Sequence, residues 1–125
     1  MRRILITIGF LIIIAIFIFS LIKGAKGEGL FPHSDKVGHC LAYFSVTYWF
    51  LNLYPRKKHF ILMIVFTFQG IIIEFLQRET GYRSFDYFDM LANFSGSLLA
   101  YILASKYCKL FKVLLDHCSP STNDD

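Results

Sequence analysis

The chain has 125 residues, of which 55% are hydrophobic and 14 are phenylalanine, and its formal net charge is +4. A soluble domain of this length could not bury so much apolar surface, because small domains bury the smallest share of their chain. The basic residues flank apolar runs, which indicates that they orient membrane spans and argues against nucleic-acid binding.

The first two apolar segments are expected to cross a membrane as helices. Residues 4–22 are almost wholly apolar, and about 1.5 Å per residue gives a length of about 28 Å, close to that of a hydrocarbon core. A cleaved signal peptide is the alternative, but its apolar region is usually only about 7–15 residues long. Residues 35–54 form the second and least apolar span, which Ser34 is expected to cap and Pro55 to end.

Two further spans are expected at 60–76 and 85–107. The basic loop Arg56–Lys58 separates the second span from the third, and a loop over 77–84, with Gly81 as its turn residue, separates the third from the fourth. The predicted fold class is therefore an all-α integral membrane protein, built as a four-transmembrane-helix bundle.

The distribution of basic residues predicts how this bundle is oriented. Eight Lys and Arg residues fall on the side of the two termini and five on the other side, and the first group includes the compact Arg56–Lys58 loop. By the positive-inside rule, both termini are cytoplasmic and the chain is a multi-pass protein of the cell membrane. Residues 1–118 are expected to form one domain that stands alone, followed by a disordered tail over 119–125.

Polar residues gather where this topology meets the outer side of the membrane. The second and fourth spans begin there, and the third span ends there, so their polar residues fall at one depth. Within each span the spacing places them on one helix face. We expect them to form an outward-facing substrate-binding pocket. The residues are Asp35, Lys36, His39, Glu74, Gln77, Arg83, Asp86, Asp89 and Asn93.

Glu74 lies deepest of these residues along its span. An ionised carboxylate that faced lipid would cost about 2.5–3.5 kcal/mol at mid-bilayer on insertion scales, and less nearer the surface. We therefore expect Glu74 to face the interior of the bundle and to meet a cationic group, namely Lys36, His39 or Arg83.

The fourth span also carries a small residue at every fourth position. The residues of this stripe are Ala92, Gly96, Ala100 and Ala104. A stripe of this kind lets another helix approach closely, so it is a candidate surface for a homo-oligomer or a membrane partner. Chance placement in an apolar segment is the alternative, since Ala and Gly are common in membrane spans.

The ordered polar pattern resembles the VanZ-like family of membrane proteins. It reads Asp35-Lys36-x-x-His39, Glu74-x-x-Gln77, Arg83, Asp86-x-x-Asp89 and Asn93-x-x-Gly96, and the resemblance extends over residues 35–104. It implies a helical membrane protein. The namesake of the family is linked to low-level resistance to the glycopeptide teicoplanin, but the resemblance supplies no reaction mechanism.

Two functions of different kinds fit these features. The pocket could bind or process an anionic lipid-linked substrate, such as a polyprenyl-phosphate-linked envelope intermediate, with Lys36 and Arg83 as phosphate ligands. His39, Glu74 and Asp89 are then the candidate catalytic groups, because they can move protons. Alternatively, the polar residues only clamp the helices of a non-catalytic scaffold or partner subunit. The sequence leaves open whether the protein is an enzyme.

A metal site is a third possibility. Asp35, His39, Glu74 and Asp89 offer ligand types that suit zinc or manganese. A single histidine among carboxylates is a weak signal, however, and the neighbouring Lys36 disfavours a cation. The three cysteines show no CxxC pair or zinc spacing. The sequence therefore predicts no metal and no cofactor.

Overall fold

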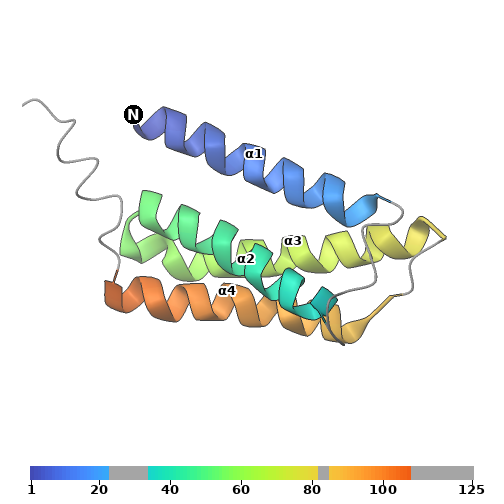
Figure 1. The fold of residues 1–125 in the computed structure, drawn as a ribbon. Coiled ribbons are helices and arrows are strands. Elements are labelled where there is room, and N and C mark those ends of the chain that lie inside the picture. Colours follow the sequence, from blue (N-terminus) through green and yellow to red (C-terminus); the bar gives the residue numbers. More distant parts are fainter. Residues whose placement is uncertain (23–33, 82–84, 108–125) are drawn as a thin grey trace, which may run out of the picture.

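The computed structural model describes residues 1–22, 34–81 and 85–107. Within these ranges the chain is all-helical and contains no strand (Figure 1). The helices are α1 (Arg2–Leu21), α2 (Ser34–Leu53), α3 (His59–Glu79) and α4 (Tyr87–Tyr107), with the short 3₁₀ helix η1 (Arg56–Lys58) between α2 and α3. The all-α prediction is confirmed for these residues, and each expected span corresponds to one helix. The predicted tail, 119–125, lies outside them.

The ends of α3 and α4 differ from the sequence prediction. The helix α3 continues to Glu79, so Gln77 is helical and not part of a loop. Helix formers such as Gln and Glu carry it one turn further. Gly81, with φ of 74°, then ends the turn in the left-handed conformation. The helix α4 starts only at Tyr87, because the Asp86 side chain caps it through the Phe88 N–H.

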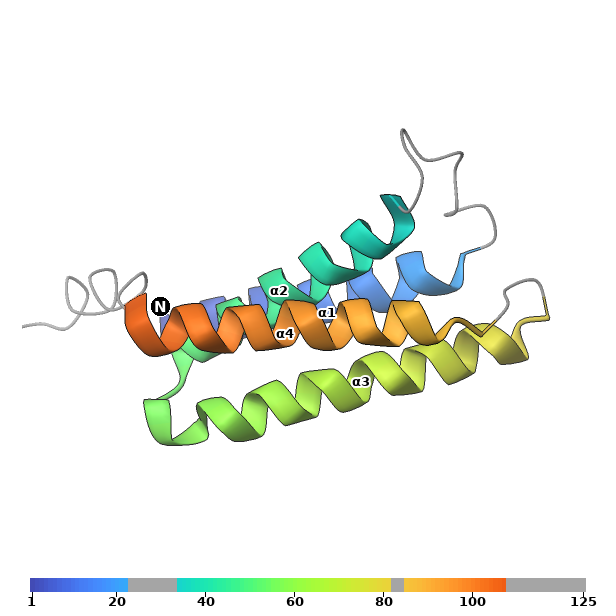
Figure 2. The same ribbon diagram turned by 90° about the horizontal axis from the view of Figure 1, so that it is seen from below.

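Successive helices run in opposite directions along the bundle (Figures 1 and 2). The indole N–H of Trp49, near the end of α2, donates to the carbonyl of Leu5 near the start of α1 at 3.0 Å. At the other end, Gln77 Nε2 of α3 donates to the carbonyl of Ser20 of α1 at 2.8 Å. The starts of α2 and α4 therefore lie at the same end of the bundle as the end of α3.

The small-residue stripe of α4 packs against α2 of the same chain. A Cβ atom at Gly96 would overlap the carbonyl oxygen of Cys40 and lie 2.9 Å from the backbone N of Phe44. Further along, Ala100 and Ala104 are fully buried in a cluster with Leu51 of α2. The close approach that the stripe predicted thus occurs within the chain. A homo-oligomer or partner subunit remains a prediction, without this buried surface to support it.

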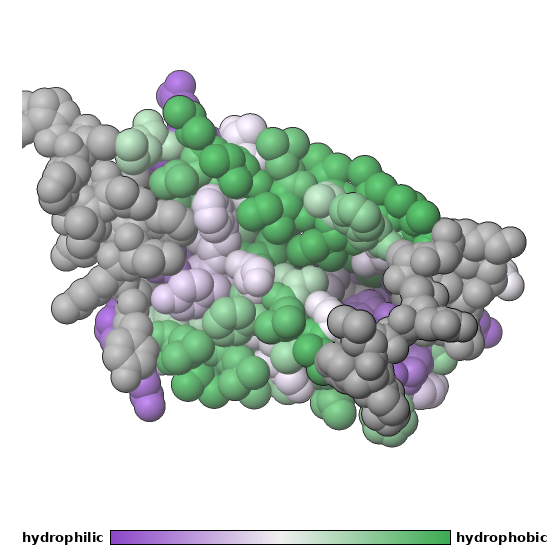
Figure 3. Space-filling model, viewed as in Figure 1, coloured by the Kyte–Doolittle hydropathy of each residue, from purple (hydrophilic) through white to green (hydrophobic). Residues whose placement is uncertain are grey.

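The surface of the bundle is largely apolar, while its interior contains both apolar and polar side chains. Large apolar side chains are exposed on every described helix, for example Phe19 on α1, Leu41 on α2, Phe68 on α3 and Leu99 on α4. Hydrophobic residues cover α1, and the most hydrophilic ones lie towards the two ends of the bundle (Figure 3). The buried polar residues are Thr47, His59, Glu74, Gln77, Asp89, Asn93 and Ser97.

Two of the helices are long and apolar enough to cross a membrane by themselves. They are α1 (Arg2–Leu21) and the segment Arg56–Glu79, which comprises η1 and α3. In the most apolar 18-residue stretch of each segment, only 6% of α1 and 33% of the second segment are buried within the bundle. Neither α2 nor α4 meets the same criterion of length and composition, because both contain many polar residues.

Replacing Gly96 tests the helix contact. Gly96→Ala would force α2 and α4 apart, because the added methyl group meets backbone atoms that cannot rotate away. We expect a loss of about 1–3 kcal/mol in the free energy of unfolding, measured in mixed detergent micelles by circular dichroism. The matched control is Gly38→Ala, where the added Cβ meets nothing within 4 Å. It should not lose stability, because Ala favours helix more than Gly. Equal stability of Gly96→Ala and the wild type would contradict the packing.

Candidate functional site

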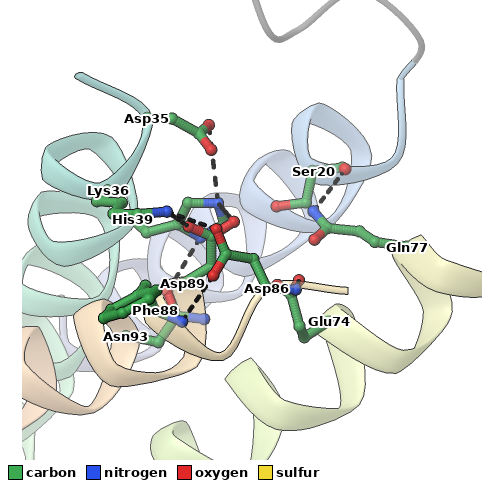
Figure 4. Close-up of polar contacts among 10 residues, drawn as sticks. All are labelled: Ser20, Asp35, Lys36, His39, Glu74, Gln77, Asp86, Phe88, Asp89 and Asn93. Carbon is green, nitrogen blue, oxygen red and sulfur yellow. Dashed lines mark hydrogen bonds and ion pairs between the residues drawn. The ribbon is translucent and has the colours of Figure 1, made fainter. Parts of the chain in front are cut away.

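An ion-pair cluster joins the first turns of α2 and α4 (Figure 4). The ammonium Nζ of Lys36 lies 2.6 Å from Asp86 Oδ2 and 3.0 Å from Asp89 Oδ1. Lys36 and Asp86 are 28% and 29% exposed, whereas Asp89 is only 2% exposed. The cluster is therefore partly exposed at Lys36 and Asp86 and buried at Asp89.

Asp86 connects three of the helices. Its Oδ2 accepts from Lys36 of α2, and its Oδ1 accepts the Phe88 N–H at 2.8 Å, which caps α4. Its own backbone N–H donates to Glu74 Oε1 of α3 at 3.0 Å. Since one residue makes all three contacts, the positions of α2, α3 and α4 are coupled at this point.

His39 is held by a second contact between α2 and α4. Its Nδ1 lies 3.1 Å from Asn93 Oδ1. An amide oxygen can only accept, so in the neutral ring Nδ1 carries the hydrogen and Nε2 presents its lone pair. Nε2 lies 3.8 Å from Asp89 Oδ2 and 4.0 Å from Asp35 Oδ1. Both distances exceed hydrogen-bond length, so the carboxylates surround this nitrogen without bonding to it.

The polar contacts continue deeper between the same two helices. Thr47 Oγ1 donates to Ser97 Oγ at 3.1 Å, and both residues are fully buried. Tyr43 is also buried, and within the described residues its hydroxyl has no hydrogen-bond partner. These three residues were not predicted from the sequence to belong to the site. A usable signal was present, because Lys36, His39, Tyr43 and Thr47 recur at three- and four-residue spacing on one helix face.

Most of the predicted pocket residues come together, with two qualifications. Glu74 is buried, as predicted, and accepts from the Asp86 backbone. Gln77 donates to the Ser20 carbonyl and so joins α3 to α1 instead of contacting the ion pairs (Figure 4). Arg83, the remaining predicted ligand, lies outside the described residues.

The described part of the site is acidic. It contains four carboxylates, from Asp35, Glu74, Asp86 and Asp89, and one ammonium group, from Lys36. Asp35, His39 and Asp89 each direct one ligand atom into a common space, and these atoms all lie within 4.8 Å of one another. These three residues could therefore hold a metal ion.

No family model matches the chain, and no solved structure matches it. Over 82 residues it is 37% identical to an uncharacterized protein of Schizosaccharomyces pombe. The match covers 62% of this chain and 51% of that protein, so the chain spans about half the length of the curated relative it matches. The VanZ-like resemblance remains a proposal.

Removing the ammonium group of Lys36 should destabilise the fold. In Lys36→Met the buried Asp89 loses its cation, and breaking a buried pair from one side costs about 3–5 kcal/mol. A second change, Asp89→Asn, should recover much of this loss because it removes the stranded charge. Chemical unfolding in detergent measures both variants. Lys57→Met, at an exposed position of η1, is the control and should have no effect. A loss of less than about 1 kcal/mol in Lys36→Met would mean that the pair is not buried as described.

Proposed function

We propose that the chain is a four-span VanZ-like protein of the cell membrane, with both termini in the cytoplasm. The main support is the largely apolar surface, with large exposed apolar side chains on all four helices and several buried polar groups between them. Leaving such large apolar side chains in water is unfavourable, whereas a lipid surface accepts them.

The polar composition of α2 and α4 is compatible with this proposal. A hydropathy criterion averages every face of a helix, but lipid contacts only the outer face. The polar groups of α2 and α4 face each other, as the pairs Lys36–Asp89, His39–Asn93 and Thr47–Ser97 illustrate. The outer faces present residues such as Leu41 and Leu99. Membrane proteins place ionisable residues towards the bundle interior in this way.

The topology can be tested by labelling single cysteines. With four spans, Lys57→Cys in η1 is cytoplasmic and Glu79→Cys at the end of α3 is external, so an impermeant maleimide added to intact cells should label only Glu79→Cys. Both positions are exposed in the folded chain. If only α1 and α3 crossed the membrane, with the same cytoplasmic N-terminus, the two results would be exchanged.

The control for this experiment is a chain without its own cysteines, in which Cys40, Cys108 and Cys118 are replaced by serine. It should remain unlabelled on both sides, and membranes opened with detergent should label both engineered positions. External labelling of Lys57→Cys in sealed cells would contradict the four-span proposal.

We also propose that the cluster binds the phosphate group of a membrane lipid. The observation that supports this is the position of Lys36, partly exposed at the end of the bundle where three helices meet. An ammonium group has three N–H donors, and Asp86 and Asp89 use two of them. A phosphate oxygen could accept from the third, while His39 and Asp89 could exchange a proton with the bound group.

The ligand is best named by its chemistry. A polyprenyl phosphate combines a phosphate group, which Lys36 could bind, with an apolar chain that lies in the bilayer. An effect on teicoplanin susceptibility, which the VanZ-like resemblance suggests, would follow only where that lipid carries a peptidoglycan precursor.

A non-catalytic scaffold is the second candidate function. The contacts of Asp86 with Lys36 and Glu74, and of Gln77 with Ser20, join all four described helices at one end. Interhelical polar contacts in membranes average only about 0.6 kcal/mol each, so several are needed to hold helices together. A network of this extent is what a structural clamp requires.

Lipid binding separates the two candidates. The full chain in nanodiscs should bind a polyprenyl phosphate about tenfold more tightly than the polyprenol of equal length, because charge-assisted hydrogen bonds contribute about 1.5–3 kcal/mol. Competition with a fluorescent analogue measures the ratio. Lys57→Met should keep the preference, since η1 lies at the opposite end of α3. Equal affinity for the phosphate and the alcohol would favour the scaffold.

A further inference from the structure

We propose that Asp35, His39 and Asp89 form a binding site for one divalent transition-metal ion of the zinc type. The site lies at the outer end of α2 and α4 and is independent of the proposed lipid binding. The three ligand atoms lie within 4.8 Å of one another and come from two helices that are fixed by their own contacts (Figure 4). Carboxylate and imidazole groups together suit zinc and its neighbours in the first transition row.

The histidine is already oriented as a metal ligand. Its side chain is nine-tenths buried, and Asn93 holds Nδ1, which directs Nε2 into the space between the two carboxylates. Nε2 makes no described hydrogen bond, and its contacts with Asp89 and Asp35 are ion pairs only when the ring is protonated. Metal-binding histidines characteristically donate their other N–H to an oxygen, as Nδ1 does here to Asn93. In the neutral ring the Nε2 lone pair is directed between two carboxylates, an arrangement that suits a cation.

The distances around Nε2 also fit an ion better than direct contact. Zinc lies about 2.0–2.2 Å from nitrogen and oxygen ligands, so two of its ligands are at most about 4.3 Å apart. The gaps of 3.8 Å to Asp89 and 4.0 Å to Asp35 fall within this limit. The third separation, between the ligand oxygens of Asp35 and Asp89, is at most 4.8 Å. The Asp35 side chain is 34% exposed, so it can move by the few tenths of an ångström that bring this separation within the limit.

Lys36 does not prevent a cation from binding here. The sequence predicted no metal partly because this lysine adjoins His39, but its ammonium group lies 2.6 Å from Asp86, which offsets its charge. Lys36 contacts Oδ1 of Asp89, which leaves Oδ2, the oxygen that faces His39, as the metal ligand. Lys36 thus positions Asp89.

Three protein ligands leave at least one coordination position for water or another group. Because the Asp35 side of the site is partly exposed, a phosphate oxygen could reach this position. A bound ion would then add positive charge beside that of Lys36. This consequence rests on the proposed lipid binding, whereas the metal site itself does not.

The test is zinc binding to the full chain in nanodiscs after treatment with a chelator. Zn²⁺ is titrated alone against a chromophoric chelator. We expect one site per chain, which Asp35→Asn weakens about tenfold or more through loss of one ligand. Asn has nearly the same shape as Asp and Asp35 is partly exposed, so the variant should fold.

The matched control is Glu79→Gln, which removes the same charge from an exposed position at the same end of the bundle. It should change affinity by less than about twofold, because salt screens exposed charges.

Absence of a stoichiometric site, or equal weakening by Asp35→Asn and Glu79→Gln, would overturn the proposal. If Asp35→Asn fails to fold, the wild-type chain loaded with Co²⁺ decides the question. Intense visible absorption of a four- or five-coordinate ion supports the site, and the weak spectrum of hydrated cobalt contradicts it. Zinc binding without lipid binding would defeat only the lipid proposal, and lipid binding without zinc would defeat only this one.

Discussion

The structure depends on the close approach of α2 to α4 at Gly96. Without a side chain at that position, the two backbones come into contact next to Cys40. This contact sets the register in which Lys36 meets Asp89 on one side of the crossing and Thr47 meets Ser97 on the other. A side chain there would separate both pairs. Gly96 therefore allows the two helices to pack closely. Close packing in turn brings together the polar groups of the site, which come from both helices.

On the four-span proposal, the same contact lets the polar helices α2 and α4 lie in a membrane. A polar group that faces lipid has no partner, but a polar group between two helices can find one. Lys36 and His39, in the first half of α2, contact α4, whereas Leu41 is exposed on the outer face. By length and composition, α1 and the segment Arg56–Glu79 qualify as membrane spans without such pairing. The proposed bundle therefore combines two apolar helices with two helices that pair through polar side chains.

The sequence predicted the four α-helices of the described residues, their approximate ends and the end of the bundle at which the polar groups gather, because apolar runs, Pro55 and Gly81 mark where helices begin or end. It did not predict which side chains meet, since that depends on how far each helix is rotated and how closely the pairs pack. Gln77 shows the difference: it lies at the expected end of the bundle, but its side chain contacts α1. The metal site is a second example. Lys36 adjoins His39 in the helix and was expected to repel a cation, but its ammonium group lies 2.6 Å from Asp86, which offsets its charge.

The central claim is that α2 and α4 pair through their polar faces while their outer faces contact lipid. The most direct measurement is the collision accessibility of a nitroxide on Leu99→Cys, at an exposed position in the middle of α4, with the chain in nanodiscs. The account predicts high accessibility to oxygen, which concentrates in the bilayer, and low accessibility to a water-soluble nickel chelate. Ready access of the nickel chelate would place α4 in water and contradict the four-span bundle.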